Sequence, residues 1–258
     1  MTTTADINRR LWESRDIVDE YDHRTKVQEV EKLIFEAHRD QLLGKRILDV
    51  GCGAGRTTVM LRQYSQHCVG LDYSEGMVAA ARRTCPDVTI VHGDMRDMRM
   101  FVDRSFDVVL CAFNGLDYVS PEDRLKTLGE MRRVLDHGGL LVFSSHNLHY
   151  ESAKQPPRFD FSPCPLRLAR NTLEYAVESF HHLRNHGRQV FADGYAVVND
   201  CAHRYALLSY YIDKTKQEEQ LRQTGFRLIE MVDKFGKALT ADSDDRSSSY
   251  IYYVALKA

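Results

Sequence analysis

The sequence has no long apolar run, no excess charge of either sign and no paired cysteine spacing. No stretch of its 258 residues approaches the length of a membrane span, and its first residues lack the apolar core of a signal peptide. The 35 basic and 37 acidic residues leave a net charge of −2, which argues against a nucleic-acid surface. The six cysteines are scattered, as in proteins that keep their thiols reduced. We therefore expect a cytoplasmic globular protein without a membrane or nucleic-acid partner.

A short apolar run followed by three glycines is the most informative stretch. Residues 46–50 predict a buried strand. Glycine then occupies every second position, at Gly51, Gly53 and Gly55, and residues 57–66 are expected to be helical. Each glycine lets the backbone turn sharply and a ligand lie against it, and strand, glycine loop and helix form a nucleotide-binding turn. The loop has no Gly-Lys-Ser/Thr, and its third glycine comes one residue early for a dinucleotide site. A P-loop site for a nucleotide phosphate chain and a dinucleotide site are therefore both disfavoured.

Two carboxylates narrow the choice of ligand. Asp49 stands just ahead of the first glycine, where a negative charge would repel a pyrophosphate but suits an ammonium group. Asp72 ends the next predicted strand, 21 residues after Gly51, where a carboxylate can accept hydrogen bonds from ribose hydroxyls. A nucleoside with a cationic amino-acid tail and no phosphate fits this pattern, and S-adenosylmethionine is such a molecule.

At these residues the chain resembles the class I S-adenosylmethionine-dependent methyltransferases. The resemblance runs from about residue 44 to 146 and rests on the ordered motifs at 47–55, 70–74, 93–95, 106–109 and 134–142. It implies that Asp49 and the loop glycines face the methionine part of the cofactor, that Asp72 binds the ribose, and that Asp94 and Met95 flank the adenine. The predicted cofactor site comprises Tyr21, Asp49, Gly51, Cys52, Gly53, Gly55, Asp72, Tyr73, Met77, Gly93, Asp94, Met95 and Asn114.

The alternation of predicted strands and helices indicates an α/β fold with a doubly wound, mostly parallel sheet, and the resemblance implies seven strands. Residues 6–22 and 25–43 each show helical spacing of apolar side chains. The apolar segments at 226–231 and 249–256 predict an antiparallel hairpin at the end of the chain. We expect a monomer or a homodimer.

Two parts of the chain are expected to cover the site. Residues 1–44 are interpreted as an N-terminal helical lid, and residues 45–258 as the cofactor-binding domain. Within that domain, residues 147–203 do not fit the minimal core and hold four of the six prolines. Long segments of this kind in compact enzymes are usually lids or binding loops. We interpret this insertion as a substrate cap made of irregular strands.

Candidate catalytic residues follow the fourth and fifth predicted strands. His146 is the best-placed general base if the acceptor needs one, since its pKa allows that role near neutrality; otherwise it is a hydrogen-bonded structural histidine. Asn114 and Tyr118 are candidates for contacting the sulfonium or the acceptor, and the alternative is a turn with a tyrosine packed beneath it. His181, His182 and His186 have no ligand partner at suitable spacing, so no metal is expected.

Aromatic side chains in the entry helices and the cap could enclose a cation, because aromatic faces attract a sulfonium as they attract ammonium. The candidates are Trp12, Tyr21, Tyr175 and Tyr195, together with Asn199, although such aromatic residues also fill cores. The predicted catalytic set is His146, Asn114, Tyr175 and Asn199.

The leading functional hypothesis is methyl transfer from S-adenosylmethionine to nitrogen, oxygen or carboxylate of a small molecule, with S-adenosylhomocysteine as product. An alternative is cyclisation or cleavage of S-adenosylmethionine to azetidine-2-carboxylate and methylthioadenosine. The Asn/Asp-Pro-Pro-aromatic motif of adenine-N6 and glutamine methyltransferases is absent after the fourth strand, and an aromatic cap suits a folded RNA poorly. An RNA or protein methyltransferase is therefore less favoured, as is a non-catalytic cofactor-binding protein.

Overall fold

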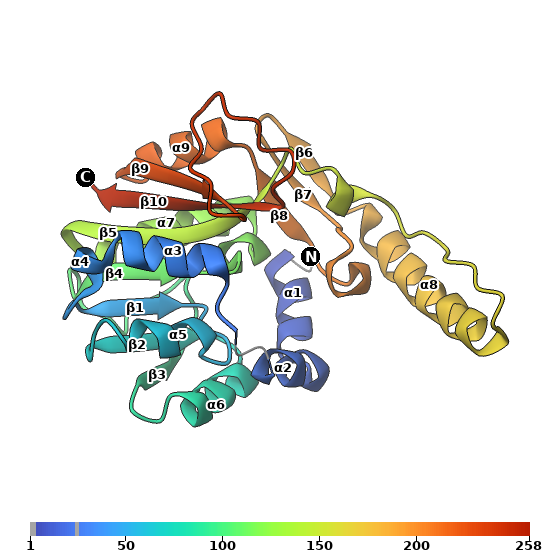
Figure 1. The fold of residues 1–258 in the computed structure, drawn as a ribbon, viewed down its shortest axis with the longest axis horizontal. Helices are drawn as coiled ribbons and strands as arrows, with labels where there is room; N and C mark the ends of the chain where they lie inside the picture. The colour runs from blue at the N-terminus through green and yellow to red at the C-terminus, as the bar shows by residue number, and fades with distance from the viewer. Residues whose placement is uncertain (1–3, 24–25) are drawn as a thin grey trace.

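The computed structural model of the protein describes residues 4–23 and 26–258 (Figure 1). Its helices are α1 (Thr4–Trp12), α2 (Arg15–Asp22), α3 (Glu29–Ala37), α4 (Arg39–Leu42), α5 (Arg56–Leu61), α6 (Glu75–Thr84), α7 (Pro121–Val134), α8 (Pro165–His186) and α9 (Lys214–Gln223). Its strands are β1 (Ile47–Val50), β2 (Cys68–Asp72), β3 (Thr89–His92), β4 (Phe106–Cys111), β5 (Leu135–Asn147), β6 (Val190–Ala192), β7 (Tyr195–Val198), β8 (Ser209–Ile212), β9 (Phe226–Asp233) and β10 (Tyr250–Lys257). Short 3-10 turns are η1 (Gly115–Tyr118), η2 (Ser152–Lys154) and η3 (Ala202–Tyr205).

The predicted doubly wound sheet is confirmed, and it carries an extension. Strands β3, β2, β1, β4 and β5 are parallel, and the antiparallel hairpin β9–β10 closes the core through β10, which pairs with β5. The long strand β5 continues beyond this core, and its last residues pair with β8. The antiparallel strands β8, β7 and β6 extend the sheet from there. The sheet therefore has ten strands in the described residues, three more than predicted.

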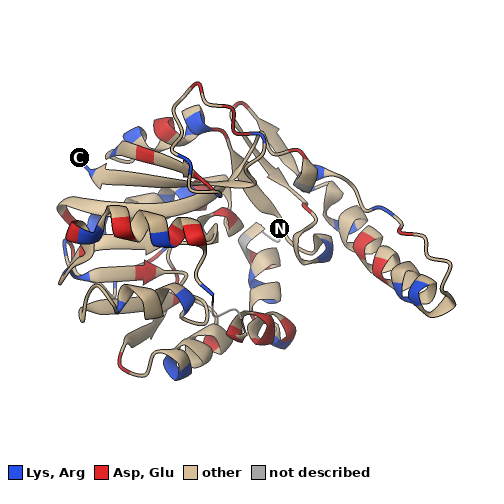
Figure 2. Cartoon of the chain, in the orientation of Figure 1, with Lys and Arg blue, Asp and Glu red and all other residues tan. Residues whose placement is uncertain are grey.

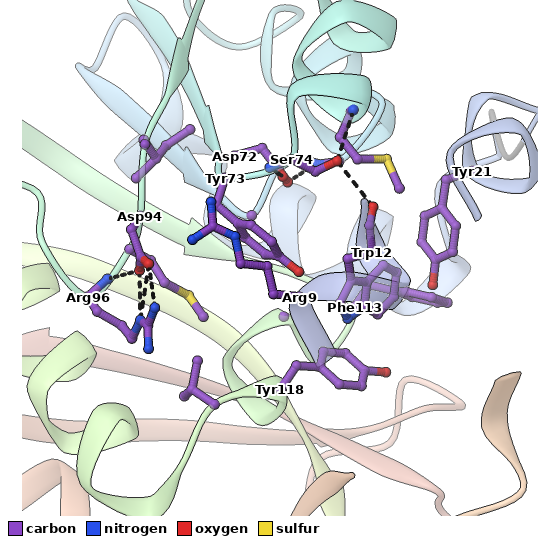
Figure 3. A pocket seen from close by; sticks show the side chains of 18 of the residues that line it. Arg9, Trp12, Tyr21, Asp72, Tyr73, Ser74, Asp94, Arg96, Phe113 and Tyr118 are labelled. Atoms are coloured by element: carbon purple, nitrogen blue, oxygen red, sulfur yellow. Dashed lines mark hydrogen bonds and ion pairs between the residues drawn. The ribbon is translucent and has the colours of Figure 1, made fainter. Parts of the chain in front are cut away.

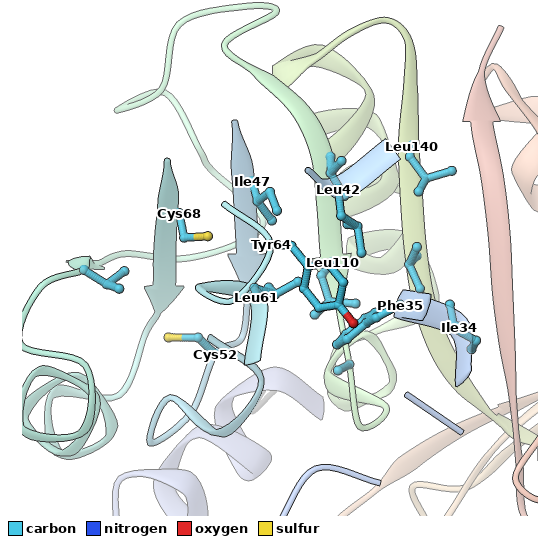
Figure 4. Close-up of a cluster of buried hydrophobic side chains, with 14 of the residues drawn as sticks. Ile34, Phe35, Leu42, Ile47, Cys52, Leu61, Tyr64, Cys68, Leu110 and Leu140 are labelled. Atoms are coloured by element: carbon cyan, nitrogen blue, oxygen red, sulfur yellow. The ribbon is translucent and has the colours of Figure 1, made fainter. Parts of the chain in front are cut away.

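Hydrophobic clusters cover both faces of the core sheet. On one face, Ile34 and Phe35 of α3 pack with Leu61 of α5 against Ile47 and Leu110 in the strands (Figure 4). On the other face, side chains of α7 and α9 pack against the strands, including Leu128, Met131, Leu221, Leu48 and Val109. Both faces of the central strands are buried, which explains why most residues of these strands are apolar.

Capping side chains mark the start of three helices. The Ser74 side chain accepts a hydrogen bond from Met77 N and caps α6. Ser120 caps α7 in the same way, and Pro121 occupies the first helical position, where its missing N–H leaves no hydrogen bond unmade. Asp213 caps α9. These caps fix where each helix starts beside the carboxyl end of a strand.

The predictions for the two covering segments need correction. Ser14 is extended and separates α1 from α2, so residues 6–22 are not one helix. In the predicted second helix, residue 25 lies outside the described residues, and the described part forms α3 and α4. The lid prediction likewise includes residues 1–3 and 24–25, which are outside the described residues.

The longest element of the insertion 147–203 is the helix α8, which was not predicted, whereas β6 and β7 are strands as expected. Residues that were read as irregular strands, among them Tyr175, Val177 and Phe180, belong to α8, whose 22 residues project from the sheet as an arm (Figure 1). The aromatic and β-branched side chains suggested strands, but their spacing fits a helix. Among the described helices, none is long and apolar enough to cross a membrane.

Candidate functional site

A cavity lies at the carboxyl ends of β1, β2 and β4 (Figure 3). The strand order reverses between β1 and β4, and ligands of doubly wound sheets bind at such a switch point. The cavity encloses about 900 Å³, including its open mouth. Nine of the thirteen predicted cofactor residues line it: Tyr21, Gly51, Gly53, Asp72, Tyr73, Met77, Gly93, Asp94 and Met95.

The glycine loop gives the cavity an open floor. Gly51 and Gly53 have φ angles of +66° and +53°, a left-handed conformation that favours glycine. A Cβ at either position would meet nothing within 4 Å, because the space beside the loop belongs to the cavity. The loop therefore leaves room for a ligand to lie against its backbone.

Asp72 is held at the end of β2 by two backbone donors. Its Oδ2 accepts from Gly53 N at 2.9 Å and its Oδ1 accepts from Ser74 N at 2.9 Å. Burial raises the pKa of this carboxyl, and the two backbone hydrogen bonds partly oppose that shift. Each oxygen keeps a further lone pair, so Asp72 can also accept hydrogen bonds from a ligand.

Asp49 is placed differently from the prediction. Its side chain is buried in β1 and is not part of the cavity lining. Oδ2 accepts from the hydroxyls of Thr57 and Thr58 at 2.8 and 2.7 Å, which ties β1 to the first turn of α5. Burial raises the pKa of Asp49 to about 6. Asp49 therefore stabilises the glycine loop from the side away from the cavity, through its hydrogen bonds to the start of α5.

A second carboxylate, Asp94, borders the cavity beside Met95. It is paired with Arg96, whose Nη2 lies 2.7 Å from Oδ2, and Arg96 also reaches Asp123. Burial raises the pKa of Asp94, but the Arg96 hydrogen bonds outweigh it and leave the pKa below its usual value. Asp94 is thus charged and oriented at neutral pH.

The mouth of the cavity has an aromatic wall, defined here as Trp12, Tyr21, Phe113 and Tyr118. His203 packs against this wall from outside the cavity lining. The Trp12 ring lies edge-on to Tyr21, Tyr118 and His203, with centroid distances of 5.2, 5.0 and 5.3 Å. Figure 3 shows Trp12, Phe113 and Tyr118 beside Arg9, which also lines the cavity. Arg9 and His203 were not predicted.

His203 reaches this wall through an unusual turn. His203, Arg204 and Tyr205 have φ angles of +46°, +56° and +61°, which non-glycine residues rarely adopt. Asn199 holds the turn, because its Nδ2 donates to the carbonyls of Tyr205 and Leu207 at 2.6 and 2.7 Å. No sequence signal marks a left-handed run of this kind, so His203 could not be predicted.

His146 belongs to a buried polar network behind the wall. Its Nδ1 lies 2.8 Å from Oδ2 of Asp117, although off the direction of a good hydrogen bond, and its backbone N–H donates to the same oxygen. Asp117 also pairs with the fully buried Arg124. The His146 ring stacks on Tyr211 at 4.8 Å and meets Tyr118 edge-on at 6.0 Å. His146 is not one of the residues that line the cavity.

The remaining predicted site residues also lie outside the lining. Tyr175 is on α8, where its ring contacts Phe159 at 5.6 Å, and Asn199 is buried in the turn described above. Tyr195 stacks on Tyr210 at 5.1 Å. Asn114 is buried with φ +60°, and its N–H donates to Ser144 Oγ. Gly55 begins α5 in a left-handed conformation.

A second cavity adjoins the first across Tyr21, Phe113 and the glycine loop. Lys26, Arg56 and Cys52 are among its lining residues. Arg56 pairs with the buried Glu31 and lies over the Phe113 ring. Within the described part of the chain, no His, Cys, Asp or Glu side chains gather in a group that could hold a metal ion.

These features fit S-adenosylmethionine. The loop leaves space where a Cβ would otherwise intrude, and no lysine follows the third glycine, so the loop is not built for a phosphate chain. Asp72 offers lone pairs to hydroxyl donors, and the aromatic wall suits a sulfonium. The chemistry of the donor set therefore agrees with a nucleoside that carries a cationic tail.

Known proteins are similar to this chain in sequence. The family model for a methyltransferase domain matches residues 47–139. A Geobacillus protein named as a methyltransferase is 30% identical over 228 residues, which cover 83% of this chain and 85% of that protein. The demethylmenaquinone methyltransferase of Beutenbergia cavernae is 41% identical over 99 residues, and that alignment spans 38% of this chain and 40% of the relative.

Solved structures share the fold at low sequence identity. The CcbJ methyltransferase of Streptomyces caelestis superposes with a TM-score of 0.62 and 18% identity, over 94% of this chain and 95% of its own. The 1,6-didemethyltoxoflavin-N1-methyltransferase of Burkholderia thailandensis has a TM-score of 0.60 and 12% identity, over 98% and 87%. The chain thus belongs to the class I S-adenosylmethionine-dependent methyltransferases, an enzyme family whose cofactor is S-adenosylmethionine.

Proposed function

We propose that this enzyme methylates a small, ring-bearing molecule that packs against the aromatic wall. The observation that carries the proposal is that Trp12, Tyr21, Phe113 and Tyr118 line the same cavity as Asp72. Flat rings pack favourably in stacked or edge-on contacts with such side chains. The names of two similar proteins, a demethylmenaquinone methyltransferase and a 1,6-didemethyltoxoflavin methyltransferase, denote small-molecule acceptors, which supports this class of substrate.

In this proposal different residues along the cavity contact different parts of the cofactor. Asp72 accepts hydrogen bonds from the ribose hydroxyls, Gly51 and Gly53 leave room for the methionine tail, and Asp94 with Met95 borders the adenine. When bound, S-adenosylmethionine supplies an electrophilic methyl group attached to a sulfonium. The predicted contacts of Tyr73, Met77 and Gly93 complete this part of the site.

The aromatic wall then orients the acceptor. An in-line displacement requires the accepting atom to be held close to the methyl carbon, and orientation of this kind supplies much of the rate enhancement. Trp12, from α1, and Tyr118, from η1, belong to separate elements that meet at the mouth. We propose that His146 acts as a positioning residue through Tyr118, because Tyr118 lies against its ring.

Labelled cofactor tests the proposal. The enzyme is incubated with S-adenosylmethionine carrying a deuterated methyl group and, in parallel, with a small-molecule metabolite extract, purified RNA or undigested protein. Mass spectrometry should find the label in a small ring-bearing compound. Label found only in RNA or protein would overturn the proposal, and methylthioadenosine without transferred label would instead support the cyclase alternative.

The Asp72→Asn variant serves as the control. It should lose labelling of the small molecule because it loses the cofactor, whereas Asp97→Asn, a change at an exposed carboxylate that pairs with Arg99, should label normally. Equal labelling by Asp72→Asn would show that the observed transfer does not come from this cavity.

A further inference from the structure

The arm formed by α8 exposes an apolar surface that the fold leaves uncovered. Nine of the seventeen exposed large hydrophobic residues in the described chain lie between positions 159 and 191. On α8 itself, Leu166, Leu173, Phe180 and Leu183 are 85%, 66%, 61% and 74% exposed. Contiguous exposed apolar surface of this kind marks an interaction site in a soluble protein.

The exposed side chains form a heptad seam. Leu166, Leu173 and Phe180 recur every seven residues, and exposed Ala169, Ala176 and Leu183 follow each of them by three. These are the a and d positions of a coiled coil, which meet a partner helix when they repeat with this period. The seam runs the length of α8, which is about 33 Å at 1.5 Å per residue.

The opposite side of α8 is occupied by its own chain. Asn171 donates to the carbonyl of Asp160 at 2.8 Å, and Asn185 donates to the carbonyl of Tyr205 at 3.2 Å. Both asparagines are buried and occupy the f position, which faces away from a and d. The seam therefore faces away from the protein to which α8 belongs.

We propose that the α8 seam binds the α8 seam of a second copy of this chain, with the two helices antiparallel. In this arrangement Leu166 meets the second copy's Leu183, Leu173 meets its Ala176, and Phe180 meets its Ala169. Two of the three layers thus pair a large side chain with an alanine, and a two-fold axis repeats every contact. A parallel pair would place alanine opposite alanine and leave gaps, which cost stability.

The size of the seam predicts a weak, reversible dimer. A neighbouring helix covers roughly a third of the lateral surface of a helix of this length, or roughly 450 Å² per copy. The total of roughly 900 Å² is below the ~1,600 Å² of a standard stable interface and falls among transient ones. We expect dimers in the micromolar range. Because α8 projects from the rest of the chain as an arm (Figure 1), an antiparallel pair would place the two catalytic cores at opposite ends of the arms.

The charge pattern favours a second copy over a lipid surface. α8 carries three arginines and two glutamates (Figure 2), whereas helices that lie on anionic membranes carry a clear basic excess. Apart from Tyr175, the exposed large hydrophobic side chains of α8 all occupy a and d positions, a stripe narrower than the apolar face of a helix that packs broadly. Helix dipoles run in opposite directions in the antiparallel pair, which is the favourable arrangement.

Sedimentation velocity over a range from low to high micromolar concentration tests the proposal. The wild-type chain should shift reversibly from monomer to dimer. Leu173→Glu and Phe180→Glu should each raise the dimer dissociation constant by roughly tenfold or more, as expected for a central apolar contact. Both positions are exposed in the monomer, so the variants should keep their circular dichroism spectrum and their cofactor binding. Val102→Glu, at a residue that is 77% exposed in the β3–β4 connection, is the matched control and should dimerise normally.

Disulfide trapping tests the register. In a background with Cys164→Ser and Cys201→Ser, which removes the two exposed cysteines, Leu173→Cys and Ala176→Cys proteins are mixed and oxidised. The antiparallel register predicts that the mixed dimer forms fastest, because a disulfide needs closely spaced Cβ atoms. Self-linked dimers alone would point to a parallel pair and overturn the register.

Three further results would overturn the proposal. The wild-type chain could remain monomeric at all concentrations, or the dimer could be unaffected by Leu173→Glu and Phe180→Glu. A monomer that binds vesicles of phosphatidylcholine and phosphatidylglycerol, and loses that binding in the same variants, would assign the seam to a lipid surface instead.

Discussion

The carboxylate of Asp72 accepts a hydrogen bond from the backbone N–H of Gly53 at 2.9 Å. This contact joins the end of β2 to the glycine loop that follows β1, and it holds the loop open at the cavity floor. The same carboxylate therefore shapes the loop and offers its remaining lone pairs to a ligand. Charge-assisted hydrogen bonds of this type are among the stronger ones.

The open floor of the cavity predicts a selective effect of Gly53→Ala. The protein should fold, because an added Cβ has no neighbour within 4 Å, but the methyl group occupies ligand space. Calorimetry should show that S-adenosylmethionine binding falls by tenfold or more, about 1.4 kcal/mol or above. Gly44→Ala is the matched control, since Gly44 also has a positive φ of +69° and an open Cβ position outside the cavity lining. It should lose about 1 kcal/mol of stability and bind normally. Equal binding by both variants would remove the loop from the site.

The aromatic wall predicts that Trp12→Ala impairs turnover of the acceptor. The variant loses edge-on contacts with Tyr21, Tyr118 and His203, each worth about 0.5–1.5 kcal/mol. We expect kcat/KM for the acceptor to fall by roughly tenfold or more, and Trp12→Phe to restore most of it. Phe235→Ala, at an aromatic residue that is 67% exposed outside the site, is the control. Unchanged kinetics in Trp12→Ala would place the acceptor elsewhere.

The buried pair of His146 and Asp117 predicts a pH-dependent stability. Burial lowers the pKa of His146, but the nearby carboxylate of Asp117 outweighs it, so the pKa is raised from 6.5. The folded protein then holds this proton more tightly than the unfolded chain. The stabilisation is fully present below the unfolded pKa and is lost as pH rises through the folded pKa.

Urea unfolding checks this pH dependence. The difference in unfolding free energy between wild type and His146→Gln should be larger at about pH 6 than at about pH 8.5. In an Asp117→Asn background the same comparison should lose this direction or reverse it, because burial lowers the pKa of His146. A difference that grew with pH would contradict the direction of the shift.

Nine of the thirteen residues predicted to bind the cofactor line one cavity, because their positions depend on local signals. The glycine loop, the acid at the end of β2 and the cap at Ser74 each lie within a few residues of the strand that they follow. The parallel sheet then brings these strand ends together at one edge. Their joint position in the cavity follows from the order of the strands.

The aromatic wall depends on contacts between distant segments, which no local pattern encodes. His203 reaches the wall only because Asn199 and α8 hold a left-handed turn. Trp12 joins it through α1, where Asn8 bonds to the carbonyls of Tyr118 and Leu208. The arm was misread because α8 lacks a buried apolar face: its hydrophobic side chains point outward, and its inner side is polar.

Asp72 provides the most direct test of the central claim that this cavity binds S-adenosylmethionine through the ribose. Calorimetry compares S-adenosylhomocysteine with an analogue that lacks both ribose hydroxyls, on the wild type and on Asp72→Asn. The wild type should bind the analogue more weakly by about 2–4 kcal/mol, and Asp72→Asn should bind both compounds weakly and nearly equally. A wild type that binds both compounds equally, or a variant that still distinguishes them fully, would contradict the account.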